Sequence, residues 1–342
     1  MGNVLKAPFP YFGGKSKVAS AVWEMLGEVD NYIEPFAGSL AVLLGRPVGF
    51  SGAETVNDVD AYLSNFWRAL SEEPEEVARY ADWPVSEVDL TARHVWLVNR
   101  KAEFAERLMG DPGYYCVRSA GWWVWGISSW IGSGWCSGDG PWNTDGEKLV
   151  KKDRGGVRRK IPHLGDAGQG VNRQLPHLGD AGQGVNRSGD LTAYMTALAE
   201  RLARVRVCCG DWRRVVTNGA MNYGKTVGVF LDPPYGFADR DTVYNNDSRA
   251  ITADVIEWCR EYADNPRVRI ALCGYGEEFE GIDLFHDWTW QSWKANISFG
   301  TTASSARGAN QNRHKEVILY SPSCVKEQPG LFAMFGDAKN KS

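Results

Sequence analysis

The residues best suited to chemistry are Asp232, Pro233, Pro234 and Tyr235. They follow the very apolar run Val227–Leu231, which is typical of a buried central strand of a parallel sheet. Ligands of open α/β sheets bind at the carboxyl ends of such strands. Since prolines stiffen a loop and have no N–H, we expect their carbonyls to face the pocket as acceptors.

This set suits transfer of a group to an exocyclic amine, whose lone pair is delocalised into its ring. Two acceptors, the Asp232 carboxylate and the Pro233 carbonyl, would draw the lone pair out of conjugation and aim it at an electrophile. The Tyr235 ring would offer a face for the base. The alternative is a purely structural Asp-Pro-Pro turn with a packed tyrosine.

Two further turns are candidates for binding a cofactor. After a predicted strand at Asn31–Glu34, the turn consists of Pro35, Phe36, Ala37 and Gly38. A glycine-containing turn before a helix points backbone N–H groups at the negative end of a ligand. Asn57 and Asp58 end the next predicted strand, where a carboxylate can accept from ribose hydroxyls. A helix N-cap is an equally good interpretation of these two residues.

The N-terminal motif consists of Tyr11, Phe12, Gly13, Gly14 and Lys15. Its two glycines predict a tight backbone, and the lysine supplies a fixed cation. The motif therefore predicts binding of a phosphate or carboxylate. Its spacing is neither that of a P-loop nor that of the dinucleotide-binding glycine fingerprint.

Alternating helices and strands are expected to position these motifs. In the N-terminal part, up to Leu70, we expect helices over Ser16–Val29, Ser39–Leu44 (with Ser39 as N-cap) and Asp60–Leu70. In the same part we expect strands over Asn31–Glu34 and Glu54–Asn57. In the last of these helices, the inward residues would be Leu63, Phe66, Trp67 and Leu70. In the C-terminal part, from Leu191 on, we expect helices over Leu191 to about Arg204 and over Thr252–Tyr262. The strands expected there are Val205–Cys209, Val227–Leu231, Arg267–Cys273 and Glu316–Tyr320. This order predicts a doubly wound α/β sheet.

The alternation stops between Leu70 and Leu191. Pro74–Asp82 and Ser86–Met109 are predicted to be helical, and six tryptophans follow between Trp122 and Trp142. Such an aromatic cluster indicates either core packing or a surface that stacks on bases or on a partner.

A basic run and a repeat follow the tryptophans. Lys148–Lys160 holds seven lysines or arginines against one aspartate, and PHLGDAGQGVNR occurs at 162–173 and again at 176–187. The composition of the repeat predicts turns or a hairpin arm. The predicted DNA-binding residues are Lys151, Lys152, Arg154, Arg158, Arg159, Lys160, Asn172, Arg173, Asn186 and Arg187. The alternative for the basic run is a solvated loop.

The order F-G-G-K, E-P-F-x-G, N-D, a long insertion, G-D-W (210–212) and D-P-P-Y resembles the Dam-like, D12-class DNA adenine-N6 methyltransferases of bacteria and bacteriophages. The resemblance covers about residues 8–70 and 190–320, and the last strand with its basic lead-in (312–319) also fits. One departure is Ser39-Leu40, where the family has further glycines.

The resemblance implies S-adenosylmethionine as cofactor. Tyr11 to Lys15 would help to hold it, and the turn from Glu34 to Gly38 would line its methionine end. Asn57-Asp58 would meet the ribose, and Asp211 and Trp212 would lie near the adenine. The catalytic pocket would consist of Asp232, Pro233, Pro234 and Tyr235.

These arguments predict a Rossmann-like methyltransferase core of residues 1–70 and 190–322. A mainly helical, loop-rich target-recognition lobe would occupy 71–189, and a tail would follow from 323 to 342. The expected reaction is direct methyl transfer to adenine N6 of double-stranded DNA after base flipping, without a metal or a covalent intermediate. No Pro-Cys dipeptide is present for C5-cytosine chemistry. The alternatives are cytosine-N4 methylation, an RNA or protein-glutamine amine methyltransferase, and a catalytically silent DNA-binding protein.

Composition adds three expectations. The formal net charge of −4 means that contacts with DNA must come from a local patch. Seven cysteines without C-x-x-C spacing, and five histidines that form no cluster with them, predict free, mostly buried thiols and no zinc site. Without a long apolar run, the protein is expected to be cytoplasmic, in a bacterial cell or a phage-infected host, and not membrane-bound. The oligomeric state, monomer or dimer, stays open.

Overall fold

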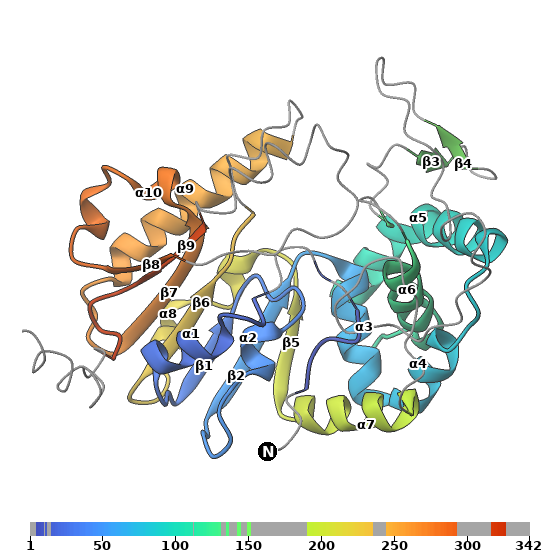
Figure 1. Cartoon of the computed structure of the whole chain (residues 1–342), viewed down its shortest axis with the longest axis horizontal. Helices are drawn as coiled ribbons and strands as arrows, with labels where there is room; N and C mark the ends of the chain where they lie inside the picture. Colours follow the sequence, from blue (N-terminus) through green and yellow to red (C-terminus); the bar gives the residue numbers. More distant parts are fainter. Residues whose placement is uncertain are drawn as a thin grey trace, which may run out of the picture.

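One large sheet and a group of helices at its side make up the protein in a computed structural model (Figure 1). The structure describes residues 5–9, 11, 15–111, 113–130, 135–136, 142–144, 149–151, 190–234, 244–292 and 316–325. For 142–144, 149–151 and 244–249 only the backbone is described.

The large sheet has seven strands in the order β5-β2-β1-β6-β7-β9-β8. They are β1 (Asn31–Glu34), β2 (Ala53–Asp58), β5 (Val205–Cys209), β6 (Val227–Leu231), β7 (Val268–Tyr275), β8 (Thr289–Ser292) and β9 (Glu316–Tyr320). The first five in chain order pair in parallel, whereas β9 is antiparallel to both β7 and β8. Every residue of the central strand β6 is buried, as its apolar sequence predicts. The predicted α/β, Rossmann-like methyltransferase core is confirmed by this sheet.

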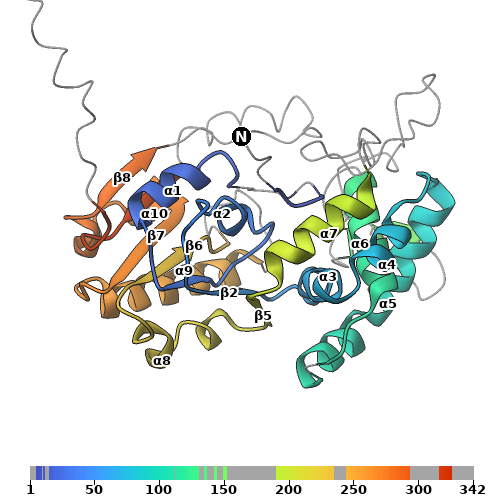
Figure 2. The same ribbon diagram turned by 90° about the horizontal axis from the view of Figure 1, so that it is seen from below.

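Helices cover both faces of the sheet (Figure 2). Alternate residues of a strand point to opposite faces, so Tyr32 and Phe230 pack into one hydrophobic cluster and Ile33 and Val229 into the other. The first cluster includes α1 (Ala19–Leu26) and α2 (Ala41–Leu44), and the second includes α8 (Asn218–Met221), α9 (Tyr244–Tyr262) and α10 (Gly276–Phe279).

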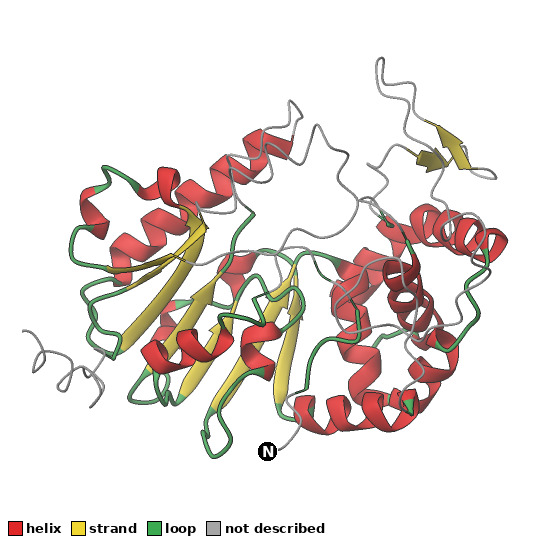
Figure 3. Ribbon diagram, viewed as in Figure 1, coloured by secondary structure: helices red, strands yellow, loops and turns green. Residues whose placement is uncertain are grey.

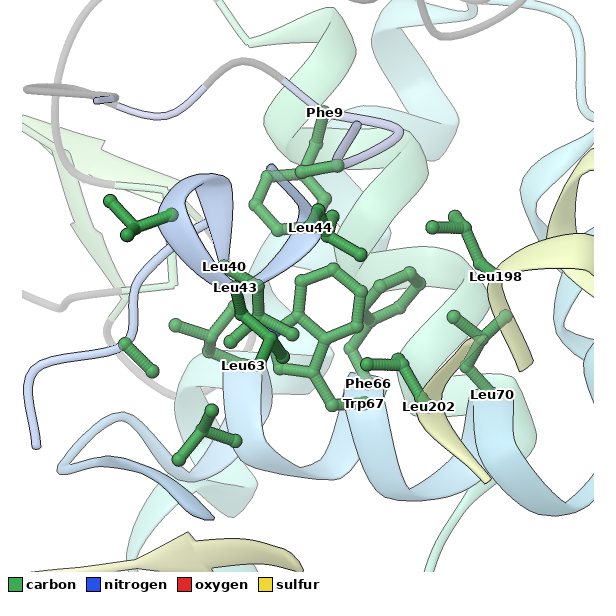
Figure 4. Packing of buried hydrophobic residues seen from close by; sticks show 14 of the residues in the cluster. Phe9, Leu40, Leu43, Leu44, Leu63, Phe66, Trp67, Leu70, Leu198 and Leu202 are labelled. Atoms are coloured by element: carbon green, nitrogen blue, oxygen red, sulfur yellow. The ribbon is translucent and has the colours of Figure 1, made fainter. Parts of the chain in front are cut away.

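A second group of helices gathers at the β5 end of the sheet (Figure 3). It consists of α3 (Ala61–Glu72), α4 (Pro74–Ala81), α5 (Glu87–Gly110), α6 (Val117–Ser129) and α7 (Leu191–Leu202). Strands β3 (Trp142–Thr144) and β4 (Leu149–Lys151) form an antiparallel pair next to α5. Helix α7 follows the predicted lobe in sequence, yet it packs against α3 and α4. One hydrophobic cluster includes both Val56 of the sheet and Trp123 of the lobe. Figure 4 shows the part of this cluster where the N-terminal loop, α2, α3 and α7 meet.

The packing confirms two predictions and adds an element. Leu63, Phe66, Trp67 and Leu70 are all buried (Figure 4). The tryptophan-rich stretch forms α6, a helix that the sequence did not predict, and Trp123, Trp125 and Trp130 are buried. For these three rings the core interpretation is correct. Arg93 reinforces this packing, because its guanidinium lies 4.2 Å from the centre of the Trp125 ring.

One predicted helix cap and one cap considered as an alternative are wrong. Helix α2 begins after Leu40, which adopts a left-handed conformation with φ of 55°, so Ser39 does not cap it. Leu40 is fully buried, which explains why a leucine occupies the place of a family glycine. Helix α3 is capped by Asp60, whose carboxylate accepts from the Tyr62 and Leu63 amides. Asn57 and Asp58 therefore do not have the capping role that was their alternative.

Three remaining expectations concern the chain as a whole. The described part contains no helix both long and apolar enough to cross a bilayer, and no group of three metal-ligating side chains. All seven cysteines are free, and five are buried. The first residues of the predicted tail pack against the core, since Cys324 is buried and the Val325 amide donates to the Met25 carbonyl at 2.8 Å.

Candidate functional site

The candidate site lies where the connections of the sheet diverge. Strands β1 and β6 are neighbours, but the chain leaves β1 toward β2 and leaves β6 toward β7. Such a switch point opens a crevice at the carboxyl ends of the strands, where α/β proteins bind ligands. Asp232 follows β6 at this edge, and the turn from Pro35 to Gly38 follows β1.

Lys15 forms an ion pair with Asp232. Its ammonium nitrogen lies 2.8 Å from Oδ2 of Asp232, and the lysine side chain is 4% exposed. Burial by itself lowers the pKa of Lys15, but the charge and hydrogen bond of Asp232, together with contributions from Cys273 and Glu316, outweigh burial and leave the pKa above its usual value. The sequence predicted both residues at the site but not their pairing. Lys15 thus fixes one oxygen of the central carboxylate.

Asp58 joins the ends of two strands. The Gly38 amide donates to its Oδ2 at 3.0 Å, and the Asp60 amide donates to its Oδ1 at 2.9 Å. Burial raises the pKa of Asp58 to about 6, because these backbone donors only partly offset the lost hydration. Gly38 has a φ of 47°, and a side chain there would come within 2.6 Å of the Tyr11 ring. The turn after β1 therefore requires glycine at this position.

Glu34 is buried beneath the same turn. It accepts from the Tyr32 hydroxyl at 3.0 Å and from the Leu43 amide at 3.2 Å. Burial raises its pKa to about 8, so the carboxyl group keeps its proton at neutral pH. These bonds give Glu34 a supporting position under the turn. Its predicted contact with a cofactor stays a prediction.

Asn57 connects three strand ends. Its amide nitrogen donates to the Pro35 carbonyl at 3.1 Å and to the Gly210 carbonyl at 3.0 Å. Its oxygen is buried and has no hydrogen-bond partner among the described residues. The side chain thereby fixes the loops after β1 and β5 relative to the end of β2, which is where a ribose was predicted to bind.

Trp212 and Phe36 form an apolar wall next to these loops. Their ring centres are 5.7 Å apart with an angle of 34° between the planes, and Trp212 is buried. Asp211 begins the short 3-10 helix Trp212–Arg214 and accepts from the Arg213 amide at 2.8 Å. Its carboxylate is about half exposed and is also paired with the Arg213 guanidinium. The structure thus brings the predicted G-D-W and E-P-F-x-G motifs together.

The rest of the D-P-P-Y motif is partly described. Pro233 is buried and Pro234 is exposed, with the Pro234 carbonyl 3.5 Å from the Thr252 hydroxyl of α9. Tyr235, Phe12, Gly13 and Gly14 lie outside the described residues. The same holds for the predicted DNA-binding residues Lys152, Arg154, Arg158, Arg159, Lys160, Asn172, Arg173, Asn186 and Arg187, whereas Lys151 ends strand β4.

Glu316 is a charged residue of this edge that the predicted site did not include. It begins β9 opposite Tyr275, the last residue of β7, and its carboxylate interacts electrostatically with Lys15 and Asp232. The sequence placed Glu316 at the start of a strand. Its position at the site depends on β9 being antiparallel, which brings a strand beginning to the edge where β6 and β7 end.

Comparison with known families gives a match over the part of the chain that contains several of these residues. Residues 11–109 match the model of the D12 class N6 adenine-specific DNA methyltransferases. The matched segment contains Tyr11, Lys15, the turn after β1 and Asp58, and it confirms the resemblance drawn from the motifs. The match supports DNA methyltransferase activity, and a family of this kind implies S-adenosylmethionine as the methyl donor. No curated protein sequence matches the chain significantly.

Proposed function

We propose that this protein is a site-specific DNA methyltransferase that transfers a methyl group from S-adenosylmethionine to N6 of adenine. The observation that carries the proposal is the position of Asp232. It follows the fully buried strand β6 at the switch point, beside a turn that lies within the matched adenine-methyltransferase segment.

The residues beside the crevice suit S-adenosylmethionine. Gly38 keeps the backbone open to close approach, Asp58 offers acceptor oxygens for ribose hydroxyls, and the wall of Phe36 and Trp212 offers an apolar surface for an adenine ring. Asp58 and Asp232 also suit the positive charge of a sulfonium. When bound, the cofactor supplies a methyl group activated for direct displacement.

The proposed role of Asp232 is to accept a hydrogen bond from the exocyclic amine. This bond pulls the nitrogen lone pair out of the ring system, so the amine becomes a nucleophile. Lys15 holds Oδ2, which fixes the orientation of the carboxylate. The Pro233 carbonyl is the proposed second acceptor, and Tyr235 the proposed stacking partner of the flipped base.

The lobe that follows α3 is the proposed DNA-binding part. A protein of net charge −4 needs a local positive surface for the phosphate backbone, and the run Lys148–Lys160 is its densest cluster of basic residues. Neutralising Lys151, Lys152, Arg158 and Arg159 together is expected to weaken binding to all sequences alike. The log–log salt dependence should become shallower by roughly one unit for each phosphate group that the variant no longer neutralises. An unchanged salt slope would remove this run from the interface.

One experiment tests the proposed function. DNA is incubated with the protein and S-adenosylmethionine carrying an isotopically labelled methyl group, digested to nucleosides and analysed by mass. Labelled N6-methyladenine is the expected product. Labelled N4-methylcytosine would show that the amine chemistry is correct and the base is wrong. Unlabelled DNA, with label found in RNA or protein supplied in parallel, would overturn the assigned substrate.

A further inference from the structure

Glu316 lies at the carboxyl edge of the sheet, beside the proposed active site, and its carboxylate has no evident role in stabilising the fold. One oxygen of its carboxylate, Oε2, is buried and has no hydrogen-bond partner among the described residues. A buried carboxylate oxygen without a partner is costly, because it has lost water and gained no donor in return. A glutamine or an apolar residue would begin the strand at lower cost. The position of this charge therefore needs an explanation beyond folding.

Among the described residues, the surroundings of Glu316 contain one cation. These surroundings consist of Lys15 in the N-terminal loop, Asp232 at the end of β6, and the Cys273 and Tyr275 side chains of β7. Glu278 of α10 is also adjacent, since it accepts from the Tyr275 amide at 2.9 Å. Burial raises the pKa of Glu316, the charge of Lys15 opposes this rise, and that of Asp232 adds to it. Two carboxylates thus compete for one buried ammonium.

This competition bears on how firmly Lys15 holds Asp232. If Asp232 were the only anion near Lys15, the buried ammonium would bind the Asp232 carboxylate tightly. The ammonium would then compete with an incoming amine for the carboxylate oxygens. A second carboxylate, that of Glu316, attracts the same ammonium and weakens that hold. Asp232 then keeps more of its charge for the hydrogen of the amine.

We propose that Glu316 is a positioning residue, which shares the charge of Lys15 with Asp232 and so keeps the Asp232 carboxylate available to the target amine. This proposal rests on the proposed function. It assigns to β9 a part in methyl transfer, at a residue that need not touch the base or the cofactor.

The first test compares the wild-type protein with Glu316→Gln over a range of pH. We expect kcat of the variant at pH 8 to be roughly tenfold lower, the change that corresponds to one pKa unit of altered interaction. KM for S-adenosylmethionine should change less than about twofold, a change of under about half a kcal/mol. The wild-type kcat should fall toward acid as Glu316 takes up a proton, and the variant should lack this limb. A variant that keeps the wild-type kcat, or loses activity but keeps the acid limb, would overturn the proposal.

The second test needs no activity. Because its pKa is raised in the folded protein, Glu316 favours folding when protonated and disfavours it when ionised. Wild-type stability relative to Glu316→Gln should therefore decline as the pH rises above about 4.5. Melting temperatures of the unliganded proteins measure this difference. A difference that is constant with pH would contradict the buried, poorly solvated carboxylate on which the proposal depends.

Two control variants separate the outcomes. Glu316→Asp retains the charge and is expected to recover part of kcat together with the acid limb. Glu54→Gln changes a carboxylate at the opposite edge of the sheet and should keep both kcat and the limb. A wild-type protein that methylates no DNA would refute the proposed function itself. An active wild type with an unaffected Glu316→Gln variant would refute only the role of Glu316.

Discussion

The two ends of strand β2 carry carboxylates in opposite states. Near its beginning, Glu54 accepts from the guanidinium groups of Arg46 at 2.9 Å and Arg201 at 2.8 Å. Burial tends to raise its pKa, but the bonds and charges of the two arginines bring the pKa below the usual value. At the other end, Asp58 accepts from backbone amides, and its pKa is raised to about 6.

The same contrast extends across the two edges of the sheet. At the carboxyl edge the pKa values of Glu34, Asp58 and Glu316 are all raised, chiefly by burial. Shifted pKa values are common at binding and catalytic sites, so the raised values mark this edge as the candidate site, whereas the paired Glu54 stabilises the fold. The carboxylates of Asp58 and Asp232 at this edge suit a cationic cofactor. The comparison thus separates a structural edge from the proposed functional edge within a single sheet.

Replacement of Asp232 by alanine should have the largest effect. The variant loses the acceptor aimed at the amine in the transition state, so the rate of methyl transfer is expected to fall on the order of 100-fold or more. Cofactor binding should persist at least in part. Initial rates with labelled cofactor measure the change, and near-wild-type transfer by Asp232→Ala would refute the assigned mechanism.

Replacement of Glu54 by glutamine tests the structural edge. Two arginines lose their shared anion, and the free energy of unfolding at pH 7 should fall by about 2 kcal/mol, less than for a fully buried pair. Because the folded pKa of Glu54 is lowered, this difference should shrink as the pH falls below about 4.5. Denaturant unfolding at pH 7 and below measures it. If Glu54→Gln also lowered the rate of methyl transfer per folded molecule, Glu54 would not be purely structural, and the contrast between the two edges would be wrong.

The pH dependence of cofactor binding tests the functional edge. Since Asp58 has a pKa of about 6, it is mostly protonated at pH 5 and mostly ionised at pH 7. If its charge contributes to binding, affinity for S-adenosylhomocysteine should fall by up to roughly tenfold between pH 7 and pH 5. Calorimetric titration of the wild type and of Asp58→Asn is the measurement. The variant should bind weakly and without this pH dependence, and an identical pH profile would exclude Asp58.

Much of the fold could be predicted because local signals and tertiary structure agree. The apolar run Val227–Leu231 is the buried central strand, and β1, β5 and β9 have the predicted bounds. Helix α6 was missed because its tryptophans and glycines gave no clear helical pattern, and its stability comes from packing in the lobe. The N-cap at Ser39 failed because Leu40, buried in the core, adopts the left-handed conformation itself.

The sequence predicted which residues lie at the candidate site better than it predicted the ion pairs and hydrogen bonds among them. Motif order placed Lys15, Asp58 and Asp232 together, and the sheet topology brings them to one edge. The Lys15–Asp232 pair joins residues far apart in the chain, which no local pattern encodes. Glu316 was missed for a related reason, because its place depends on the antiparallel insertion of β9 beside β7.

Binding of S-adenosylmethionine at the carboxyl edge of this sheet is tested by the melting temperature of the protein with and without S-adenosylhomocysteine. A ligand that binds only the folded state stabilises it by roughly 3 kcal/mol at a hundredfold excess over Kd. We predict a rise of several degrees for the wild type and an equal rise for Glu54→Gln, with no rise on addition of NAD or ATP. No shift at millimolar S-adenosylhomocysteine, or an equal shift with NAD, would contradict the account.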